Sequence, residues 1–228
     1  MFNEEQRISN IVDIQKYFKK KSFSYEIILV NDGSYDGTLS AIKKYNKQKY
    51  FKLITYNKNR GKGYAIKQGM IAATGKYRLF TDIDLSTPIK EFNKFIPHLR
   101  NNAVIIATRK QKSSEFIKRQ PLLREMLGKG FTFLSRIILR VSSSDFTCGF
   151  KCFSEKAANK IFIRQKIERW GFDSEVLYLT KKNKLRVKEI TVSWINDTRT
   201  KVRFPEDVIT SFFELMKIVY YDYRKYYD

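Results

Sequence analysis

Short apolar runs alternate with amphipathic stretches along the first half of the chain, and this alternation limits the possible folds more than any other feature of the sequence. It is typical of α/β proteins, in which strands and helices follow one another and helices cover a mostly parallel sheet. We expect strands at residues 25–30, 51–56, 77–81 and 103–107, and helices at residues 38–47, 63–73 and 88–99. The pattern therefore predicts an α/β fold with four candidate parallel strands.

The second half is less regular, with helices expected at residues 121–141, at 173–182 and from 205 onward, and strand-like runs at 145–153 and 186–194. Pro88 and Pro205 stand where helices should begin. The hydroxyls of Ser86 and Thr87 precede the first of these helices and can cap its exposed N–H groups.

The chain opens on an amphipathic segment at residues 8–18, with no strand ahead of it. A parallel sheet of this kind normally opens with a strand, so we expect the first strand to be missing. A length of 228 residues suits one compact domain. We expect that domain to cover residues 1–204, truncated at its N-terminal end. Residues 205–228 should form an amphipathic helix that packs on the domain or on a membrane surface.

The charge balance points to an anionic partner. Lys and Arg total 45 against 23 Asp and Glu, a formal net charge of +22. Nucleic acid, anionic lipid and a phosphorylated ligand all fit this charge, and charge alone does not choose among them. The basic residues are spread along the whole chain, so a generally basic solvated surface is an equal alternative.

Few residues are left for sulfur or imidazole chemistry. Cys148 and Cys152 are too few for a disulfide framework or a zinc site, and we expect them to be reduced and buried. His98 is the single histidine, which argues against a catalytic triad or a multi-histidine metal site. Carboxylates must therefore carry any chemistry. No apolar run reaches the roughly 18 residues of a membrane-spanning helix, and no secretion signal opens the chain.

Two carboxylates, Asp82 and Asp84, follow the expected strand at 77–81. Side chains two positions apart project on the same side, and ligands of open α/β sheets bind beyond the carboxyl ends of the strands. A hard cation such as Mg²⁺ takes one or two carboxylates together with substrate phosphates. The pair can therefore hold a cation on a phosphorylated ligand, although two solvated turn aspartates would give the same short pattern.

Two further turns favour a ligand site. Asp32 follows the expected strand at 25–30, in a turn that contains Gly33 and Gly37, and it can accept hydrogen bonds from a base or a ribose. Residues 59–63, Asn-Arg-Gly-Lys-Gly, precede the expected helix at 63–73, where a helix N-terminus suits phosphate. This segment is not a Walker loop, and each turn by itself is weak evidence.

Taken together, these segments resemble the inverting glycosyltransferases of family 2, which have the GT-A fold. The matching segments are FNEE at 2–5, NDGSYDGT at 31–38, NRGKGYAIKQGMIAATGKY at 59–77, DIDLSTP at 82–88, ATRK at 107–110, PLLREMLGKG at 121–130, DFTCGFK at 145–151 and WGFDSEVL at 170–177. They run in consistent order over roughly residues 2–200. The segments DIDLSTP, DFTCGFK and WGFDSE are most similar to the branch that glucosylates dolichyl or other polyprenyl phosphates.

The resemblance implies a role for particular residues. The donor nucleotide would be bound by Phe2, Glu4, Val30, Asp32, Asp82, Ile83 and Lys201. Asp82 and Asp84 would hold the diphosphate and a divalent metal, Mg²⁺ or Mn²⁺. The expected catalytic residues are Asp84, Arg109, Arg124 and Asp145, with the two arginines facing the phosphates near a lipid acceptor. Glu175 matches a further motif acid to which the sequence assigns no role.

The expected function is the inverting transfer of a hexose, glucose from UDP-glucose, to a dolichyl-type polyprenyl phosphate. The protein would lie peripherally at the cytoplasmic face of a membrane. A GDP-mannose-dependent mannosyltransferase, a polysaccharide glycosyltransferase and an inactive truncated relic stay open as alternatives. A nucleic-acid-binding protein is a further alternative suggested by charge alone, and no RNP-type motif or zinc-finger spacing supports it. Nucleic acid is therefore not an expected partner, and the oligomeric state stays open.

Overall fold

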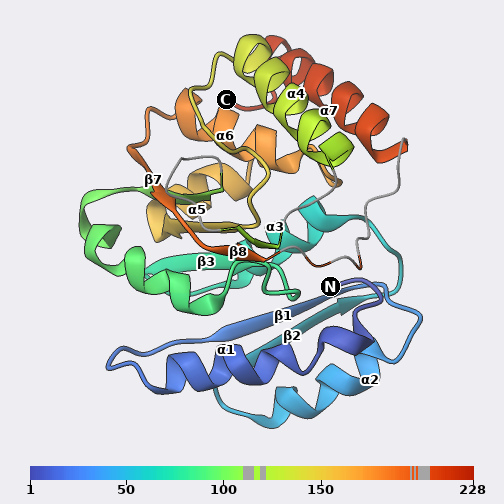
Figure 1. Cartoon of the computed structure of the whole chain (residues 1–228), viewed down its shortest axis with the longest axis vertical. Coiled ribbons are helices and arrows are strands. Elements are labelled where there is room, and N and C mark those ends of the chain that lie inside the picture. Colours follow the sequence, from blue (N-terminus) through green and yellow to red (C-terminus); the bar gives the residue numbers. More distant parts are fainter. Residues whose placement is uncertain (110–115, 119–121, 196, 198, 200–205) are drawn as a thin grey trace.

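The structure is a computed structural model that describes residues 1–109, 116–118, 122–195, 197, 199 and 206–228. Side chains are described for all of these except residues 116–118 and 122–125. Within the described residues the chain is an α/β protein of two sheets and a short strand pair, with helices packed on both larger sheets (Figure 1). The predicted α/β class is confirmed.

The N-terminal part is built around two parallel strands. Its elements are α1 (Asn10–Lys19), β1 (Ile27–Asp32), α2 (Thr38–Lys43), β2 (Phe51–Tyr56) and α3 (Lys62–Ala72). β1 and β2 pair in parallel, with Ile27 opposite Phe51 and Asp32 opposite Tyr56. The alternating apolar residues of β1 face two layers. Ile27 and Leu29 join a buried cluster with α1, while Val30 lies against α3 at Gly69.

A four-stranded sheet forms the centre of the molecule, in the order β3-β6-β4-β7. Its strands are β3 (Tyr77–Thr81), β4 (Val104–Thr108), β6 (Phe150–Ser154) and β7 (Val187–Thr191). β4 and β7 are parallel, but β6 runs antiparallel to both of its neighbours. All five residues of β4 are buried, as expected for a central strand covered on both faces. The four-stranded sheet is therefore mixed, with β6 as its one antiparallel strand.

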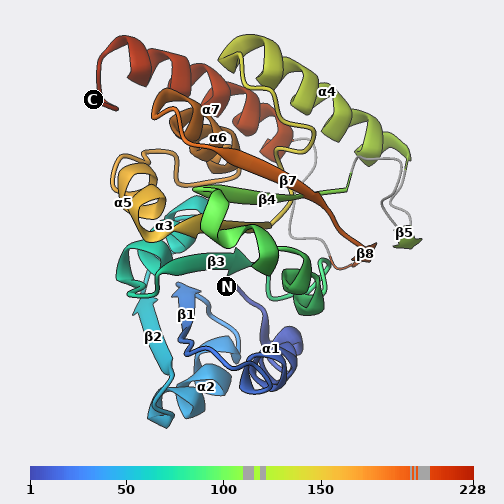
Figure 2. The ribbon, with the colours of Figure 1, turned by 90° about the vertical axis from the view of Figure 1, so that its left-hand side faces the viewer.

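Helices of the second half cover the central sheet on the side away from β1 (Figures 1 and 2). They are α4 (Leu122–Leu139), α5 (Glu155–Phe162), α6 (Phe172–Lys182) and α7 (Glu206–Tyr223). α7 packs on α4 and α6, and its buried residues Leu215 and Ile218 join the core formed with β4, β6, α5 and α6. The short strands β5 (Phe116–Lys118) and β8 (Trp194–Ile195) pair with each other in parallel. The predicted domain boundary at 204 and 205 lies outside the described residues.

Several expected elements differ in detail. The helix predicted at 88–99 is instead two 3-10 helices, Ile89–Lys94 and Ile96–Asn101. Its predicted capping is wrong, because Pro88 is the N-cap and no side chain caps it. The segment predicted as a strand from residue 145 becomes one only at Phe150. α5 was not expected from the sequence, although Ser154 caps it by accepting a hydrogen bond from the Ala157 N–H. Pro205 lies outside the described residues.

Both cysteines are reduced and buried, which confirms that prediction. Cys148 precedes β6 and Cys152 lies within it. Burial raises the pKa of the Cys148 thiol to about 11 and that of the Cys152 thiol to about 12. Both side chains therefore act as small apolar core groups at neutral pH.

Candidate active site

One cavity of ≈ 2090 Å³ is lined along β1 and β3 and by residues that follow their carboxyl ends. It brings together eight of the residues singled out from the sequence: Phe2, Glu4, Val30, Asp32, Asp82, Ile83, Asp84 and Arg109. Asp145 does not line this cavity. Arg124 falls within α4, but its side chain lies outside the described part of the chain, and so does all of Lys201.

Asp82 and Asp84 follow β3 directly and both line the cavity. The Lys62 ammonium lies 2.7 Å from Oδ1 of Asp82, and Oδ1 of Asp84 accepts a hydrogen bond of 2.9 Å from the Ser86 N–H. Burial raises the pKa of the Asp84 carboxyl, and the negative charge of Asp82 raises it further. A cation between the two carboxylates would relieve this repulsion.

The pairing of β3 with β6 places Gly149 underneath Asp82. Thr81 lies opposite Phe150 in the sheet, so the residues just outside that pair, Asp82 and Gly149, are brought together. A methyl group added at Gly149 would lie 2.6 Å from Cγ of Asp82 and closer still to one of its oxygens. Any residue other than glycine at position 149 would therefore displace the Asp82 side chain.

Asp32 fixes the loop that leads into α3. Its carboxylate accepts hydrogen bonds from the N–H groups of Arg60 and Gly61, both at 2.9 Å, and from the Asn59 side chain at 2.8 Å. Gly61 has φ +115°, a conformation that favours glycine. Both carboxylate oxygens thus have donors within the chain, and contact of Asp32 with a base stays a prediction.

Some donors of residues 59–63, where the sequence suggested a phosphate site, are already used within the chain. Two N–H groups of this segment bind Asp32, and the Tyr64 N–H donates to the Glu168 carbonyl oxygen. The Arg60 guanidinium forms an ion pair with Glu168 and lies 3.6 Å from the centre of the Tyr64 ring. Lys62 is the cation of this segment that lines the cavity.

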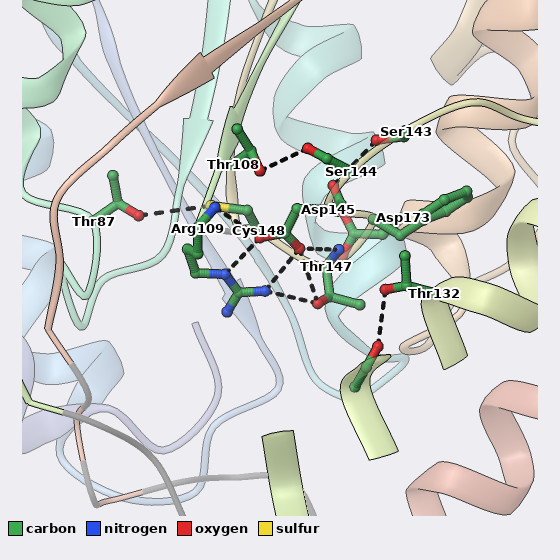
Figure 3. Close-up of polar contacts among 12 residues, drawn as sticks. Thr87, Thr108, Arg109, Thr132, Ser143, Ser144, Asp145, Thr147, Cys148 and Asp173 are labelled. Atoms are coloured by element: carbon green, nitrogen blue, oxygen red, sulfur yellow. Dashed lines mark hydrogen bonds and ion pairs between the residues drawn. The ribbon is translucent and has the colours of Figure 1, made fainter. Parts of the chain in front are cut away.

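Arg109 follows β4 and is held by a buried carboxylate (Figure 3). Its Nε donates to Asp145 at 2.8 Å. Its Nη2 donates to Asp145 and to the Thr147 hydroxyl, both at 2.9 Å. Asp145 is fully buried, whereas the Arg109 side chain is 18% exposed. Burial lowers the pKa of Arg109, but the charge of Asp145 outweighs this and raises it, so the guanidinium stays a fixed cation. Asp145 thus acts on the cavity through Arg109.

The opening residues form one wall of the cavity with the turn at 31–38. The Asn3 N–H donates to Ser34 Oγ at 2.9 Å, and the Glu4 N–H donates to Thr38 Oγ1 at 2.7 Å. The Phe2 ring lies edge-on to the Tyr35 ring, with 5.7 Å between centroids. Two aromatic rings at the mouth of a cavity suit stacking with a nucleobase.

Sequence reasoning missed several residues that line the cavity, namely Tyr35, Gly149, Trp170, Asp173 and Trp194. Tyr35 is 84% exposed and lies in the acidic turn at 31–38. An aromatic residue in an expected surface turn could have been recognised as a candidate for ligand contact. Gly149, Trp170 and Asp173 lie within the segments 145–151 and 170–177 that carry the resemblance, although no role was assigned to them there, and Trp194 lies outside the matching segments.

Glu175 has a structural role and lies outside the cavity. It is fully buried and accepts hydrogen bonds from the N–H groups of Lys166 and Ile167, both at 2.8 Å, and from the Tyr227 hydroxyl at 2.6 Å. Burial raises the pKa of its carboxyl to about 7. The residue ties α6 to the C-terminal end of the chain.

Comparison with solved structures supports the fold. The chain is similar to glucosyl-3-phosphoglycerate synthase from Mycobacterium tuberculosis in complex with UDP, with 16% identity, a TM-score of 0.67, and coverage of 96% of this chain and 77% of that one. It is also similar to S. aureus TarS 1-349 in complex with UDP-GlcNAc, with 17% identity, a TM-score of 0.56, and coverage of 96% and 64%. These likenesses show the GT-A fold.

Curated relatives extend the comparison to sequence. A Drosophila melanogaster protein named dolichyl-phosphate beta-glucosyltransferase is 34% identical over 209 residues, which cover 85% of this chain and 64% of that protein. The Homo sapiens protein of the same name is 35% identical over 210 residues, with the same coverage. The chain thus spans 64% of the length of these relatives.

A family model described as glycosyl transferase family 2 matches residues 1–162, which include the opening segment, the Asp32 turn, Asp82 and Asp84, and the pair of Arg109 with Asp145. This match covers well over half of the chain and confirms the resemblance read from the motifs. The chain belongs to glycosyltransferase family 2.

Proposed function

We propose that this chain transfers glucose from UDP-glucose to a polyprenyl phosphate of the dolichyl type. The observation that carries the proposal is the joint cavity, which is lined by Asp82 and Asp84 and by Arg109, whose cation Asp145 holds in place. Relatives that share about a third of its residues are named for glucose transfer to dolichyl phosphate. Solved neighbours of the same fold contain UDP.

The acidic pair fits a divalent metal, Mg²⁺ or Mn²⁺. Asp82 and Asp84 line a cavity large enough for a nucleotide, and the pKa of Asp84 is raised. A divalent metal held by the two carboxylates would take its other ligands from the diphosphate. Once bound, such a cation supplies positive charge to the leaving nucleotide diphosphate. Solved neighbours hold Mn²⁺ with UDP, which supports this choice of ligand.

In the proposed reaction an oxygen of the acceptor phosphate attacks the anomeric carbon, and the bond from that carbon to the diphosphate oxygen breaks. A phosphate monoester has a second pKa of about 6, so its oxygen is already ionised at neutral pH and needs no strong general base. The acceptor phosphate does need a cation that binds it in the active site. Arg109, oriented by Asp145, would supply that cation, and Arg124 stays a predicted second one.

The test is an Asp84→Asn variant assayed with UDP-glucose, Mg²⁺ and dolichyl phosphate. Loss of one metal ligand should lower transfer by at least about 100-fold. Asp13→Asn, which changes an exposed aspartate on α1, is the matched control and should be unaffected. Near-normal transfer by Asp84→Asn would refute the role given to the acidic pair. A panel with GDP-mannose separates the donors, and faster transfer from GDP-mannose would overturn the choice of glucose.

A lipid acceptor requires access to a membrane, and α4 and α7 supply a suitable surface. The two helices pack side by side (Figures 1 and 2), and both expose large apolar side chains. The exposed large apolar residues on them are Met126, Phe133, Leu134, Ile137, Ile209, Phe212, Phe213, Met216, Val219, Tyr220 and Tyr223. Within the described residues, no helix has both the length and the apolar character needed to cross a bilayer. We propose that this face lies in the interface at the cytoplasmic side, aided by the net charge of +22.

Vesicle flotation tests the membrane face. Phe213→Ser removes a side chain that is 60% exposed on α7 and should lower binding to vesicles containing phosphatidylserine severalfold. Ile163→Ser is the matched control, because Ile163 is 59% exposed but lies at the end of α5. Equal losses in both variants, or none in either, would count against this face.

A further inference from the structure

A second cavity, of ≈ 760 Å³, lies between three segments: the loop after β2, the loop between α5 and α6, and one face of α7. We call it the basic groove, because five of the side chains that line it are the cations Lys58, Arg60, Lys166, Arg169 and Lys217. A cleft lined by charges of one sign concentrates their field and attracts ions of the opposite sign. The basic groove should therefore bind an anion.

Two carboxylates also line the basic groove, and neither of them neutralises its lysines. Glu168 forms an ion pair with Arg60. Glu214 is buried on α7, where its Oε2 accepts a hydrogen bond of 2.7 Å from the Gly171 N–H. Within the part of the chain that the structure describes, no ion pair involves the three lysines of the groove. These lysines are therefore available to a ligand.

The walls of the basic groove are tied to one another. The Tyr64 N–H donates to the Glu168 carbonyl oxygen at 2.9 Å, and Arg60 pairs with the Glu168 carboxylate, so the first two segments are joined. Glu214 joins α7 to the second segment at Gly171, where an added methyl group would lie only 2.7 Å from Cβ of Glu214. A site whose walls are already fixed loses little conformational entropy when it binds a ligand.

Phe213 connects the basic groove with the apolar surface of α7. Its side chain lines the groove and is largely exposed. With 3.6 residues per turn, Ile209 and Met216 lie on one side of Phe213, and Thr210 and Lys217 lie on the other. The first two are exposed apolar residues, and the last two line the groove. A ligand that contacts both sides of Phe213 needs a charged part and an apolar part.

Anionic phospholipids have both parts. A phosphate headgroup in the basic groove would place the acyl chains of the same lipid over Ile209 and Met216. A soluble phosphate compound or a nucleic acid would use the cations but leave these apolar side chains in contact with water. The position of Phe213 therefore favours a lipid over the other anions that the net charge allows.

We propose that the basic groove binds the phosphate headgroup of an anionic phospholipid, whose acyl chains lie against the apolar residues of α7. This inference rests on the membrane contact proposed above for α4 and α7. It adds a binding site for one class of lipid, and a headgroup held at one end of the apolar surface would fix how the protein is oriented on the bilayer.

The test measures flotation with two kinds of vesicle, phosphatidylcholine alone and phosphatidylcholine mixed with phosphatidylserine. The groove variant combines Lys58→Gln, Lys166→Gln and Lys217→Gln. The matched control combines Lys43→Gln, Lys47→Gln and Lys49→Gln, which removes the same charge from exposed lysines near α2, at the opposite end of the molecule from α7 (Figures 1 and 2).

The groove variant should bind the phosphatidylserine vesicles at least about tenfold more weakly than the parent, and the control should stay within about twofold of it. All three proteins should bind phosphatidylcholine alone to the same extent. Because none of the six lysines lines the active-site cavity, transfer to dolichyl phosphate in detergent should be unchanged in both variants, which also shows that they are folded.

Three outcomes would overturn the proposal. Equal weakening in the groove variant and the control would show that only net charge matters. Parent-like vesicle binding by the groove variant, with weaker binding of single-stranded RNA, would assign the groove to nucleic acid. Loss of vesicle binding in Phe213→Ser but not in the groove variant would leave the membrane face in place and refute the groove alone. A parent protein that floats with neither kind of vesicle would instead refute the membrane face itself, and the lipid site with it.

Discussion

Gly149→Ala separates the geometry of the acidic pair from the stability of the fold. The added methyl group would lie 2.6 Å from Cγ of Asp82, where ordinary contact needs at least 3.4 Å, so the carboxylate has to move by roughly 1 Å. It can do so, because its side chain is 37% exposed and it is the end of a flexible group. The φ angle of Gly149 is outside the left-handed region, so alanine causes no backbone strain.

The expected loss of stability is much smaller than the expected loss of catalytic activity. The ion pair of Asp82 with Lys62 is partly exposed, and breaking such a pair lowers the free energy of unfolding by about 0.2–1 kcal/mol. A misplacement of about 1 Å at a reacting centre costs about 100-fold in turnover, which is about 2.7 kcal/mol in activation free energy. We therefore expect a folded protein with a large catalytic defect.

The assay measures kcat for transfer from UDP-glucose and the affinity for UDP in the presence of Mn²⁺, alongside Tm. Gly130→Ala is the control, since a methyl group there meets nothing within 4 Å and replaces a glycine within α4. It should raise the free energy of unfolding by about 0.5–1 kcal/mol and leave transfer unchanged. Turnover and UDP affinity of Gly149→Ala within twofold of the parent would refute the reasoning.

Three further predictions concern buried groups. Asp145→Ala leaves Arg109 without its buried partner and should lower the free energy of unfolding by about 3–5 kcal/mol in urea titrations; a loss below about 1 kcal/mol would contradict this. Cys148 and Cys152, with thiol pKa values of about 11 and about 12, should resist iodoacetamide at pH 8 in the native protein and react after denaturation, as followed by mass spectrometry. The folded pKa of Glu175 is about 7 against 4.5 unfolded, so its contribution to stability is full below pH 4.5 and is lost as pH rises to about 7, a change of up to about 3 kcal/mol. Glu175→Gln should flatten this part of the pH profile, and an unchanged profile would sink the assignment.

Several residues that line the candidate site were singled out from the sequence. The strand at 77–81 was predicted at the bounds that β3 has, and it places Asp82 and Asp84 at a strand end. Phe2, Glu4, Val30 and Asp32 were expected near the donor nucleotide, and all of them line the cavity. The strand prediction succeeded because alternation of apolar side chains and the position of a strand end are properties of consecutive residues, whereas nucleotide binding by these four residues stays a prediction from the resemblance.

Other features depend on partners that are far apart in the chain. The antiparallel direction of β6 places Gly149 under Asp82, and neither residue marks the other in the sequence. Arg60 and Lys62 stand two positions apart in one basic loop, yet one pairs with Glu168 and the other with Asp82. Side-chain direction in such a loop is decided by which carboxylate the fold brings within reach.

The sequence by itself determined the α/β class, the acidic pair at a strand end and membership of the family, because local periodicity and short motifs indicate each of these. The small number of cysteines indicated that they are reduced. Only the tertiary structure decided how the strands pair. It also placed Asp145 behind Arg109, outside the cavity. The physical reason is that strand pairing and the burial of charge are settled by hydrogen bonds and contacts between distant segments, which a chain acquires only on folding.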